Sequence, residues 1–167
     1  MNPLVNCLVA STIQHGIYGF IFYSTWLRSV LKNNHWSFIF CCYLMKIWSG
    51  YQYLLYLLPL PIYASWSTIL ISLLSIGYGI HLNLKVHELL GIQSIYYGYE
   101  LGVKPLTWIE SYPYSMIKDP QYVGIGLQYS GVSLTYLCTP DSIRWDVLFS
   151  CLYLCGLYKV TSWIESS

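Results

Sequence analysis

Charged residues are scarce in this chain. Asp, Glu, Lys and Arg together make up 9% of the 167 residues, whereas an average soluble domain carries about 25%. Apolar residues account for 56% and aromatic residues for 18%. Too few charges remain to solvate the surface of a soluble globular domain, which excludes that class. The net charge of +1 offers no electrostatic footprint for nucleic acid, so we expect no nucleic-acid partner.

The few charges leave long stretches of the chain without any. No Asp, Glu, Lys or Arg occurs in residues 1–27, 47–84 or 121–140. A membrane-spanning helix needs roughly 20 mainly apolar residues, because only a helix satisfies its own backbone groups in hydrocarbon. The second stretch is long enough for more than one crossing, and Pro59 and Pro61 interrupt it where a turn is expected. The sequence therefore predicts an all-α integral membrane protein.

We predict a single membrane domain over residues 1–167, a bundle of four to five transmembrane helices. The expected helices cover residues 5–27, 36–58, 63–86, 121–138 and 143–164, and a polar segment covers residues 87–120. Gln14 and His15 interrupt the first helix, and Lys159 lies near the end of the fifth, where its long side chain can reach the membrane interface.

The distribution of basic residues predicts the orientation of this bundle. With five crossings, only Arg144 lies on one side, and five basic residues fall on the other: Arg28, Lys32, Lys85, Lys104 and Lys118. Because cytoplasmic loops carry an excess of Lys and Arg, the side with five is expected to be cytoplasmic. The 87–120 segment is then cytoplasmic, and the last helix returns Glu165 to the same side.

The cysteines and histidines do not form a metal-binding pattern. The six cysteines fall in or beside expected spans and the four histidines are scattered, so we expect buried, unreactive thiols and no metal site. Lys46 lies in the middle of the second expected helix, where an ionisable side chain is a functional candidate. It would either meet a lipid phosphate from the bilayer or pair with a carboxylate of another helix, and the sequence leaves both open.

The region from residue 77 to residue 124 contains an ordered series of glycine, tyrosine and proline motifs. The series is Gly77-Tyr78-Gly79, Glu88-Leu89-Leu90-Gly91, Tyr96-Tyr97-Gly98, Tyr112-Pro113-Tyr114 and Lys118-Asp119-Pro120-Gln121-Tyr122-Val123-Gly124. Glycine pairs in membrane helices commonly mark close packing, and tyrosines at helix ends commonly anchor the protein at the interface. Taken together, the order and spacing resemble the phospholipid N-methyltransferases, the membrane family that methylates phosphatidylethanolamine and its partly methylated forms.

This resemblance implies S-adenosylmethionine as the methyl donor, bound on the cytoplasmic side, and a membrane lipid as the acceptor. The implied product route leads through the mono- and dimethyl intermediates toward phosphatidylcholine, in the endoplasmic reticulum membrane. Glu165 and Tyr122 are the implied catalytic residues. The implied cofactor-binding residues are Gly77, Tyr78, Gly79, Gly91, Gly98, Pro120, Tyr122, Gly124, Glu165 and Ser166. Two positions depart from the family pattern: Ser166 replaces a second acid, and Asp119 replaces Asn or His.

The sequence contains residues that could accept a proton and residues that could bind a cation in such a reaction. One proton must leave the ammonium headgroup, and the carboxylates that could accept it are Glu165, Glu100, Glu88 and Glu110. Aromatic faces attract a sulfonium or methylated ammonium by cation–π interaction, and the candidates are Tyr97, Tyr112, Tyr114 and Tyr122. For any one of these tyrosines taken singly, a role as an interface anchor is the favoured explanation.

Helical spacing makes two further predictions for the third expected helix. Steps of four and three from Gly77 reach His81, Lys85 and Glu88, and we expect this polar stripe to face the bundle. The reason is that a charge at mid-bilayer costs about 2.5–3.5 kcal/mol on insertion scales. Gly79 lies about 200° around the helix from Gly77, so a straight helix does not present both glycines to one partner.

Two other interpretations remain open. The chain could be a different membrane methyltransferase, such as an isoprenylcysteine carboxyl methyltransferase, although those carry His-Pro where this sequence has Asp119-Pro120. It could also be a non-catalytic polytopic membrane protein in which the glycines only pack helices and the tyrosines only anchor them. Binding of S-adenosylmethionine separates the enzymes from the last possibility.

Overall fold

The structure of the protein is a computed structural model that describes residues 2–106 and 108–165. It contains six helices: α1 (Pro3–Tyr23), α2 (Thr25–Asn33), α3 (His35–Leu57), α4 (Trp66–Ile95), α5 (Pro120–Tyr136) and α6 (Trp145–Glu165). Within the described residues, the only strand-like pairing is an isolated bridge between Cys138 and Ile143. The predicted all-α class is confirmed.

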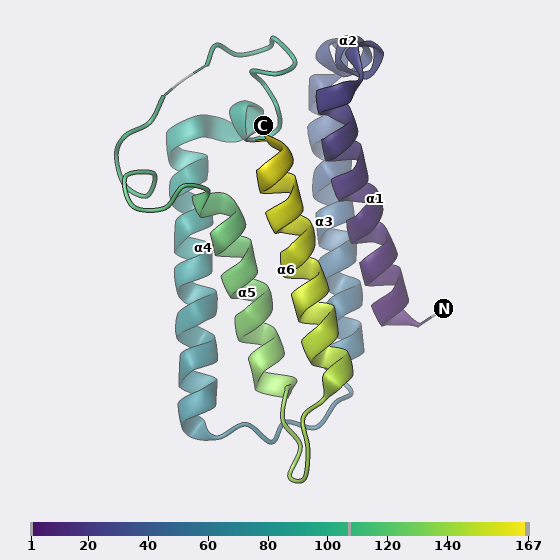
Figure 1. Ribbon diagram of the computed structural model, residues 1–167, viewed down its shortest axis with the longest axis vertical. Helices are drawn as coiled ribbons and strands as arrows, with labels where there is room; N and C mark the ends of the chain where they lie inside the picture. The colour runs from purple at the N-terminus through teal and green to yellow at the C-terminus, as the bar shows by residue number, and fades with distance from the viewer. Residues whose placement is uncertain (1, 107, 166–167) are drawn as a thin grey trace.

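The five long helices lie side by side, and the short α2 lies at one end of α1 and α3 (Figure 1). Helix α4 packs on α5, α5 on α6, α6 on α1, and α1 on α3. The chain runs up and down so that α2, the connection at residues 96–119 and the last turn of α6 gather at one end, which we call the loop end (Figure 1). The connections at residues 58–65 and 137–144 lie at the opposite end.

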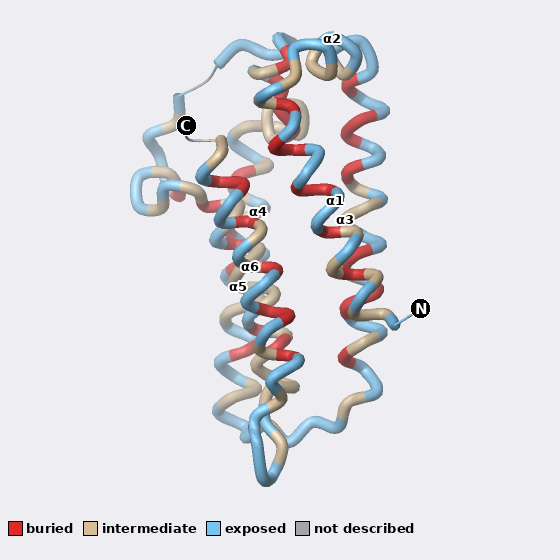
Figure 2. Tube along the Cα trace, turned by 45° about the vertical axis from the view of Figure 1, so that its right-hand side comes forward, coloured by how far each residue is buried: buried red, intermediate tan, exposed pale blue. Residues whose placement is uncertain are grey.

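Three of the helices, α1, α4 and α6, are long and apolar enough to cross a membrane. Large apolar side chains cover their outer faces: Leu74 is 64% exposed and Phe149 62% exposed, while the buried positions turn toward neighbouring helices (Figure 2). The chain is therefore an integral membrane protein. Four to five crossings were expected. By length and composition the structure supports three, because α5 has only 17 residues and polar side chains such as Lys46 interrupt α3.

The first expected helix, residues 5–27, is shorter than predicted at its C-terminal end. Helix α1 ends at Tyr23, where Ser24 adopts an extended conformation and its side chain accepts a hydrogen bond of 3.1 Å from the backbone N–H of Leu27. This N-cap starts a new helix, because it satisfies a backbone donor that the first turn leaves free. The stretch that carries Arg28 and Lys32, predicted as a linker, is the nine-residue helix α2.

Helix α4 continues nine residues beyond the predicted end at residue 86. The first part of the expected 87–120 segment is thus helical, and the connection proper begins at Tyr96. Gly91 interrupts the helix with a φ of 73°, a conformation that glycine adopts readily because it has no Cβ. The last turn of α4 consequently bends across the loop end of the bundle (Figure 1).

Glycines allow α4 and α5 to touch through their backbones. A Cβ atom at Gly79 would lie 2.4 Å from the carbonyl oxygen of Gly124, and a Cβ atom at Gly124 would lie 2.7 Å from the carbonyl oxygen of Gly79. About two turns further along the contact, a Cβ atom at Gly131 would lie 2.8 Å from the Ser72 carbonyl oxygen. This close contact fixes the position of α5 along the axis of α4.

The polar stripe on α4 does not face the bundle, contrary to our expectation. His81 and Glu88 are exposed, and Gly77 has open space around it. Lys85 pairs with Glu88 at 2.7 Å, so neither charge requires a partner from another helix. The side chain of Tyr112 covers His81 with a centroid distance of 5.9 Å, which shows that the 96–119 connection passes over this outer face of α4 before it reaches α5.

Candidate active site

The carboxylate of Glu165 is the centre of the candidate site. It lies at the C-terminal end of α6 and accepts hydrogen bonds from the phenols of Tyr97, at 2.6 Å, and of Tyr122. Both phenols donate to the same oxygen, Oε1, and the described residues offer no hydrogen bond to Oε2. The three side chains come from α6, the 96–119 connection and α5, so the site joins segments that are far apart in the sequence.

A polar cavity of about 160 Å³ opens beside Glu165. Three carboxylates, from Glu100, Asp119 and Glu165, and three phenols, from Tyr97, Tyr114 and Tyr122, contribute to its lining; its other lining residues are Leu90, Ser94, Ile95, Pro120 and Gln121. No lysine or arginine is among these lining residues. A pocket with this charge attracts a positively charged ligand, and its aromatic faces favour a sulfonium or an ammonium group. We call it the acidic cavity.

A strained turn aims Tyr97 at Glu165. Tyr97 has a φ of 61°, a left-handed conformation that is uncommon for residues other than glycine. The next residue must be glycine, because a Cβ atom at Gly98 would lie 2.5 Å from the carbonyl oxygen of Gln93. The ring of His35 holds the turn from the other side through a 2.7 Å hydrogen bond with the carbonyl oxygen of Tyr96. Neighbouring structure thus enforces an otherwise unfavourable backbone, a pattern that concentrates at functional sites.

The start of α5 positions the remaining polar groups of the acidic cavity. Pro120 occupies the first turn of the helix, where its missing N–H costs nothing, and Asp119 precedes it. The side chain of Asp119 accepts a hydrogen bond from the hydroxyl of Ser162, one turn before Glu165 on α6. This contact ties the beginning of α5 to the end of α6 and keeps Tyr122 next to Glu165.

The tyrosines of the connection are held in their protonated form. Burial raises the pKa of Tyr97 well above its ordinary value, and electrostatic interactions with Tyr122 and with the Glu165 carboxylate add to the effect. Burial, with a smaller contribution from Asp119, raises the pKa of Tyr114 to about 12. Both phenols therefore stay protonated at neutral pH and keep a hydrogen to donate.

Lys46 of α3 lies next to this site. Its Nζ donates a 3.0 Å hydrogen bond to the phenol of Tyr96 and lies 4.7 Å from the centre of the same ring. The single ion pair among the described residues joins Lys85 and Glu88, so no carboxylate of the described chain lies within 4 Å of Lys46. The predicted alternative of a carboxylate partner on another helix is therefore not realised in this structure.

Lys46 also lines two further cavities. One, of about 340 Å³, lies between α3, α5 and α6; its other lining residues are Gly50, Tyr53, Leu54, Ile125, Gln128, Tyr129, Val132 and Tyr158. The second has a volume of only about 10 Å³ and lies among Tyr18, Tyr96, Tyr97, Tyr122 and Tyr158, together with Lys46, Ile95 and Gln121. The cavity of about 10 Å³ shares Tyr97 and Tyr122 with the acidic cavity. We call the cavity of about 340 Å³ the lateral groove and the cavity of about 10 Å³ the tyrosine constriction.

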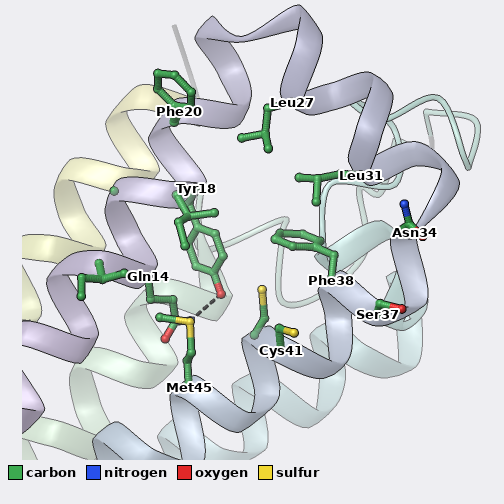
Figure 3. A pocket seen from close by; sticks show the side chains of 14 residues that line it. Gln14, Tyr18, Phe20, Leu27, Leu31, Asn34, Ser37, Phe38, Cys41 and Met45 are labelled. Atoms are coloured by element: carbon green, nitrogen blue, oxygen red, sulfur yellow. Dashed lines mark hydrogen bonds between the residues drawn. The ribbon is translucent and has the colours of Figure 1, made fainter.

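The largest cavity, of about 750 Å³, is not part of this site. It lies between α1, α2 and α3, and apolar side chains such as Leu27, Leu31 and Phe38 line it (Figure 3). Its main polar feature is the hydrogen bond between Gln14 and the phenol of Tyr18, which Figure 3 shows as a dashed line. Without a charged side chain, this cavity offers lipid contact but no acid–base chemistry.

The acidic cavity suits the charge of S-adenosylmethionine. Its three carboxylates and its tyrosine rings match the sulfonium and ammonium groups of that molecule. With about 160 Å³ it is smaller than the roughly 300–1,000 Å³ of most ligand pockets. A neighbouring cavity of about 270 Å³, lined by Lys118, Lys159 and Ser162 among others, shares Asp119 and Tyr122 with it. The combined volume of the two cavities falls within the range of ligand pockets.

The structure brings some of the predicted cofactor residues together and separates others. Pro120, Tyr122 and Glu165 line the acidic cavity. Gly79 and Gly124 lie in the α4–α5 contact, and Gly91 and Gly98 shape the path of the backbone. Two further predicted residues, Gly77 and Tyr78, are exposed on the outer face of α4. Ser166 lies outside the described residues. Of the candidate proton acceptors, Glu165 and Glu100 line the acidic cavity, whereas Glu88 and Glu110 do not.

Sequence reasoning assigned no role to Ser162 or Tyr158, two residues of α6 that contribute to the site. The hydroxyl of Ser162 donates a hydrogen bond to Asp119, and Tyr158 lines the tyrosine constriction. A signal for Ser162 was present, because residues three apart on a helix share a face and Ser162 precedes Glu165 by three. No comparable signal existed for Tyr158, whose position depends on the packing of α6 against α5.

Similarity to known proteins covers the part of the chain that forms this site. A phosphatidyl-N-methylethanolamine N-methyltransferase of Arabidopsis thaliana is 44% identical over 48 residues, which is 29% of this chain and 29% of that protein. The match thus spans less than a third of the relative. No solved structure matches the chain. The sequence model of the phospholipid methyltransferase family matches residues 67–165, more than half of the chain and all of the region from α4 to Glu165. The chain therefore belongs to the phospholipid methyltransferase family.

Proposed function

We propose that this protein transfers methyl groups from S-adenosylmethionine to the amine of phosphatidylethanolamine, or of its mono- and dimethyl forms, toward phosphatidylcholine. The observation that carries this proposal is the Glu165 carboxylate, held by Tyr97 and Tyr122 at the edge of a cavity with three acidic side chains. Family membership supports the reaction class, and the Arabidopsis relative supports an ethanolamine lipid as the acceptor.

Pro120, Tyr122 and Glu165 would hold the cofactor, with Asp119 and Glu100 adding negative charge. When bound, S-adenosylmethionine supplies a methyl group activated by its positively charged sulfur. The protein then contributes orientation and desolvation, which account for much of the rate when two reactants are held in line. A cofactor role for Gly77, Tyr78, Gly79, Gly91, Gly98, Gly124 and Ser166 stays a prediction.

Glu165 is the best placed group to accept the proton of the substrate ammonium. A general base must lie within hydrogen-bond reach of the proton that it removes. Oε1 already accepts two phenol donors, so Oε2 is the oxygen available for this step. The two phenols orient the carboxylate, and their rings supply faces that attract a methylated ammonium.

We further propose that α3 and α5 also cross the membrane, which gives five crossings with the loop end in the cytoplasm. Helices α3 and α5 lie side by side with the three apolar helices, and at 1.5 Å per residue α3 spans about 34 Å. The loop end carries Arg28, Lys32, Lys104 and Lys118, whereas Arg144 lies at the opposite end. This excess fits the positive-inside rule. We propose the endoplasmic reticulum as the host membrane.

Incubation of the purified protein with radiolabelled S-adenosylmethionine and a panel of lipids tests the proposal. The panel contains phosphatidylethanolamine, its monomethyl and dimethyl forms, and a prenylated cysteine peptide. We expect label in the ethanolamine lipids and none in the peptide. Label in the peptide alone would show an isoprenylcysteine-type enzyme, and failure to bind S-adenosylmethionine would remove the chain from the methyltransferases altogether.

A further inference from the structure

Lys46 is a cation in the interior of the bundle that interacts with the Glu165 carboxylate only at a distance, beyond the reach of a direct ion pair. It lies halfway along α3, and its contacts are with the phenol and ring of Tyr96. A charge at this depth is costly unless it pairs with an opposite charge or serves a ligand. Among the described residues no carboxylate lies within 4 Å of it, so the structure leaves its charge free to meet an anion from outside the chain.

The lateral groove at Lys46 has the polarity of a lipid. Toward the loop end, Lys46, Gln128 and Tyr158 provide polar groups. Leu54 on α3 and Val132 on α5 are apolar. They lie toward the opposite end of the groove, because both helices begin at the loop end and run away from it. The groove therefore presents a cation and hydrogen-bond donors at one end and hydrocarbon surface at the other.

The polar end of the lateral groove leads toward Glu165. Lys46 and Tyr158 line both the lateral groove and the tyrosine constriction. Tyr97 and Tyr122 in turn line both the tyrosine constriction and the acidic cavity. From the middle of the membrane, the described residues thus present a cation, then a set of tyrosines, then a carboxylate. A phospholipid with an amine headgroup carries the complementary order of charges, a phosphate followed by an ammonium group.

We propose that Lys46 binds the phosphate of the substrate lipid and so positions its amine toward Glu165. The acyl chains lie along the apolar end of the lateral groove, and the headgroup lies at the tyrosine constriction, whose volume of about 10 Å³ must widen for the amine to approach Glu165. This inference rests on the proposed function for the identity of the amine, but the phosphate contact stands on the lysine and the groove. Lys46 is a substrate-positioning residue here and takes no part in the transfer of the methyl group.

The test is a direct measurement of lipid binding that does not depend on methyl transfer. The detergent-purified protein is titrated with phosphatidylcholine and with diacylglycerol of the same acyl chains, and bound lipid is counted by native mass spectrometry. Three variants are compared with the parent: Lys46→Met, Lys46→Arg and, as control, Lys85→Met. Lys85 is a matched control because it lies in a helix of the same bundle, outside every cavity described above, and pairs with a surface glutamate.

We expect the parent to prefer phosphatidylcholine over diacylglycerol, and Lys46→Met to lower that preference at least tenfold. Lys46→Arg should restore most of it, since a guanidinium also binds phosphate, and Lys85→Met should leave it unchanged. Retention of the preference in Lys46→Met, or absence of any preference in the parent, would overturn the inference. A methionine in a membrane helix is not expected to impair folding, and a thermal melt of each variant verifies this.

A kinetic measurement separates this inference from the proposed function. In the labelled-methyl assay, Lys46→Met should raise the KM for phosphatidylethanolamine at least tenfold and leave the affinity for S-adenosylmethionine unchanged. A parent that transfers no methyl group would refute the proposed function while the lipid-binding result still decides the role of Lys46. An active parent whose Lys46→Met variant keeps the same KM would refute the role of Lys46 alone.

Discussion

Tyr97 and Glu165 are 68 residues apart in the sequence and meet through a 2.6 Å hydrogen bond from the phenol to the carboxylate. The contact joins the connection after α4 to the last residue of α6, and it encloses one side of the acidic cavity. It also explains why a helix-end carboxylate is held in one orientation instead of being free in solvent. The first two predictions concern this contact.

Glu165→Gln should weaken the binding of S-adenosylmethionine by roughly 10- to 150-fold. The amide is nearly isosteric, but it removes the charge, and a hydrogen bond to a charged group is worth about 1.5–3 kcal/mol. Isothermal titration calorimetry on the purified protein measures the affinity. Asp141→Asn, at the opposite end of the bundle, is the matched control and should bind as the parent does. A well-folded Glu165→Gln protein with parental affinity would show that Glu165 is only a helix-end charge.

Tyr97→Phe should reduce methyl transfer, and its effect should not add to that of Glu165→Gln. Each phenol donates to Oε1, so removing one loosens the orientation of the carboxylate. In a double-mutant cycle we expect a coupling of about 0.5–3 kcal/mol between the two positions, the range for residues in direct contact. The exposed neighbour Tyr99 provides the control, and Tyr99→Phe should be silent. Additive effects of Tyr97→Phe and Glu165→Gln would argue against the contact.

Gly79→Ala should destabilise the protein, whereas Gly77→Ala should not. A methyl group at Gly79 would press on the carbonyl oxygen of Gly124, and overpacking of this kind costs about 1–3 kcal/mol. Gly77 has open space on all sides, so alanine there should be neutral or slightly stabilising, by up to about 1 kcal/mol from helix propensity. Thermal melts in the same detergent compare the two. Equal melting temperatures would mean that α4 and α5 do not touch at Gly79.

Gly98→Ala should disturb the site more than the fold. A Cβ atom would collide with the carbonyl oxygen of Gln93, so the turn must open and Tyr97 must move away from Glu165. We expect a loss of methyl transfer similar to that of Tyr97→Phe or larger, with a small change in melting temperature because the helices remain packed. Gly156→Ala is the control, since that glycine has open space around it on α6. Full activity of Gly98→Ala would show that the turn does not position Tyr97.

Residues 110 and 141 should lie on opposite sides of the membrane. The structure places the connection that contains Glu110 at the loop end and Asp141 at the other end of the bundle. On a background without native cysteines, single cysteines at these positions are labelled in sealed vesicles with a reagent that does not cross the membrane. We expect only one of the two positions to react from a given side. Reaction of both from the same side would contradict the proposed five crossings.

The helices could be read from the sequence because they depend on local composition. Helix α5 begins within one residue of the predicted position, since Asp119-Pro120 marks a helix start by itself. The angular separation of Gly77 and Gly79 correctly predicted that they do not share a partner, since only Gly79 is buried against a neighbouring helix. The bend at Gly91 was not predictable, because a glycine within a helical pattern is compatible with both a straight and a bent helix.

The site was only partly accessible from the sequence. Glu165 and Tyr122 were identified through a family resemblance, and their hydrogen bond is visible only in three dimensions. The conformation of Tyr97 depends on contacts of its two neighbours, that of Gly98 with Gln93 and that of Tyr96 with His35, and neither contact carries a local signal. The predicted orientation of the polar stripe on α4 was wrong because charges in a membrane helix need not turn inward when they pair with each other. Lys85 and Glu88 instead neutralise each other on the surface.

The two tyrosines at residues 96 and 97 contact opposite charges: Tyr96 accepts a hydrogen bond from the Lys46 ammonium, and Tyr97 donates one to the Glu165 carboxylate. A single trans peptide unit separates them, so their Cα atoms are about 3.8 Å apart whatever the surrounding helices do. The peptide bond therefore couples the contact of Lys46 on α3 to the contact of Glu165 on α6, because a movement of the backbone at either tyrosine also moves the other. A shift of either helix that displaces one of the two contacts should disturb the other as well.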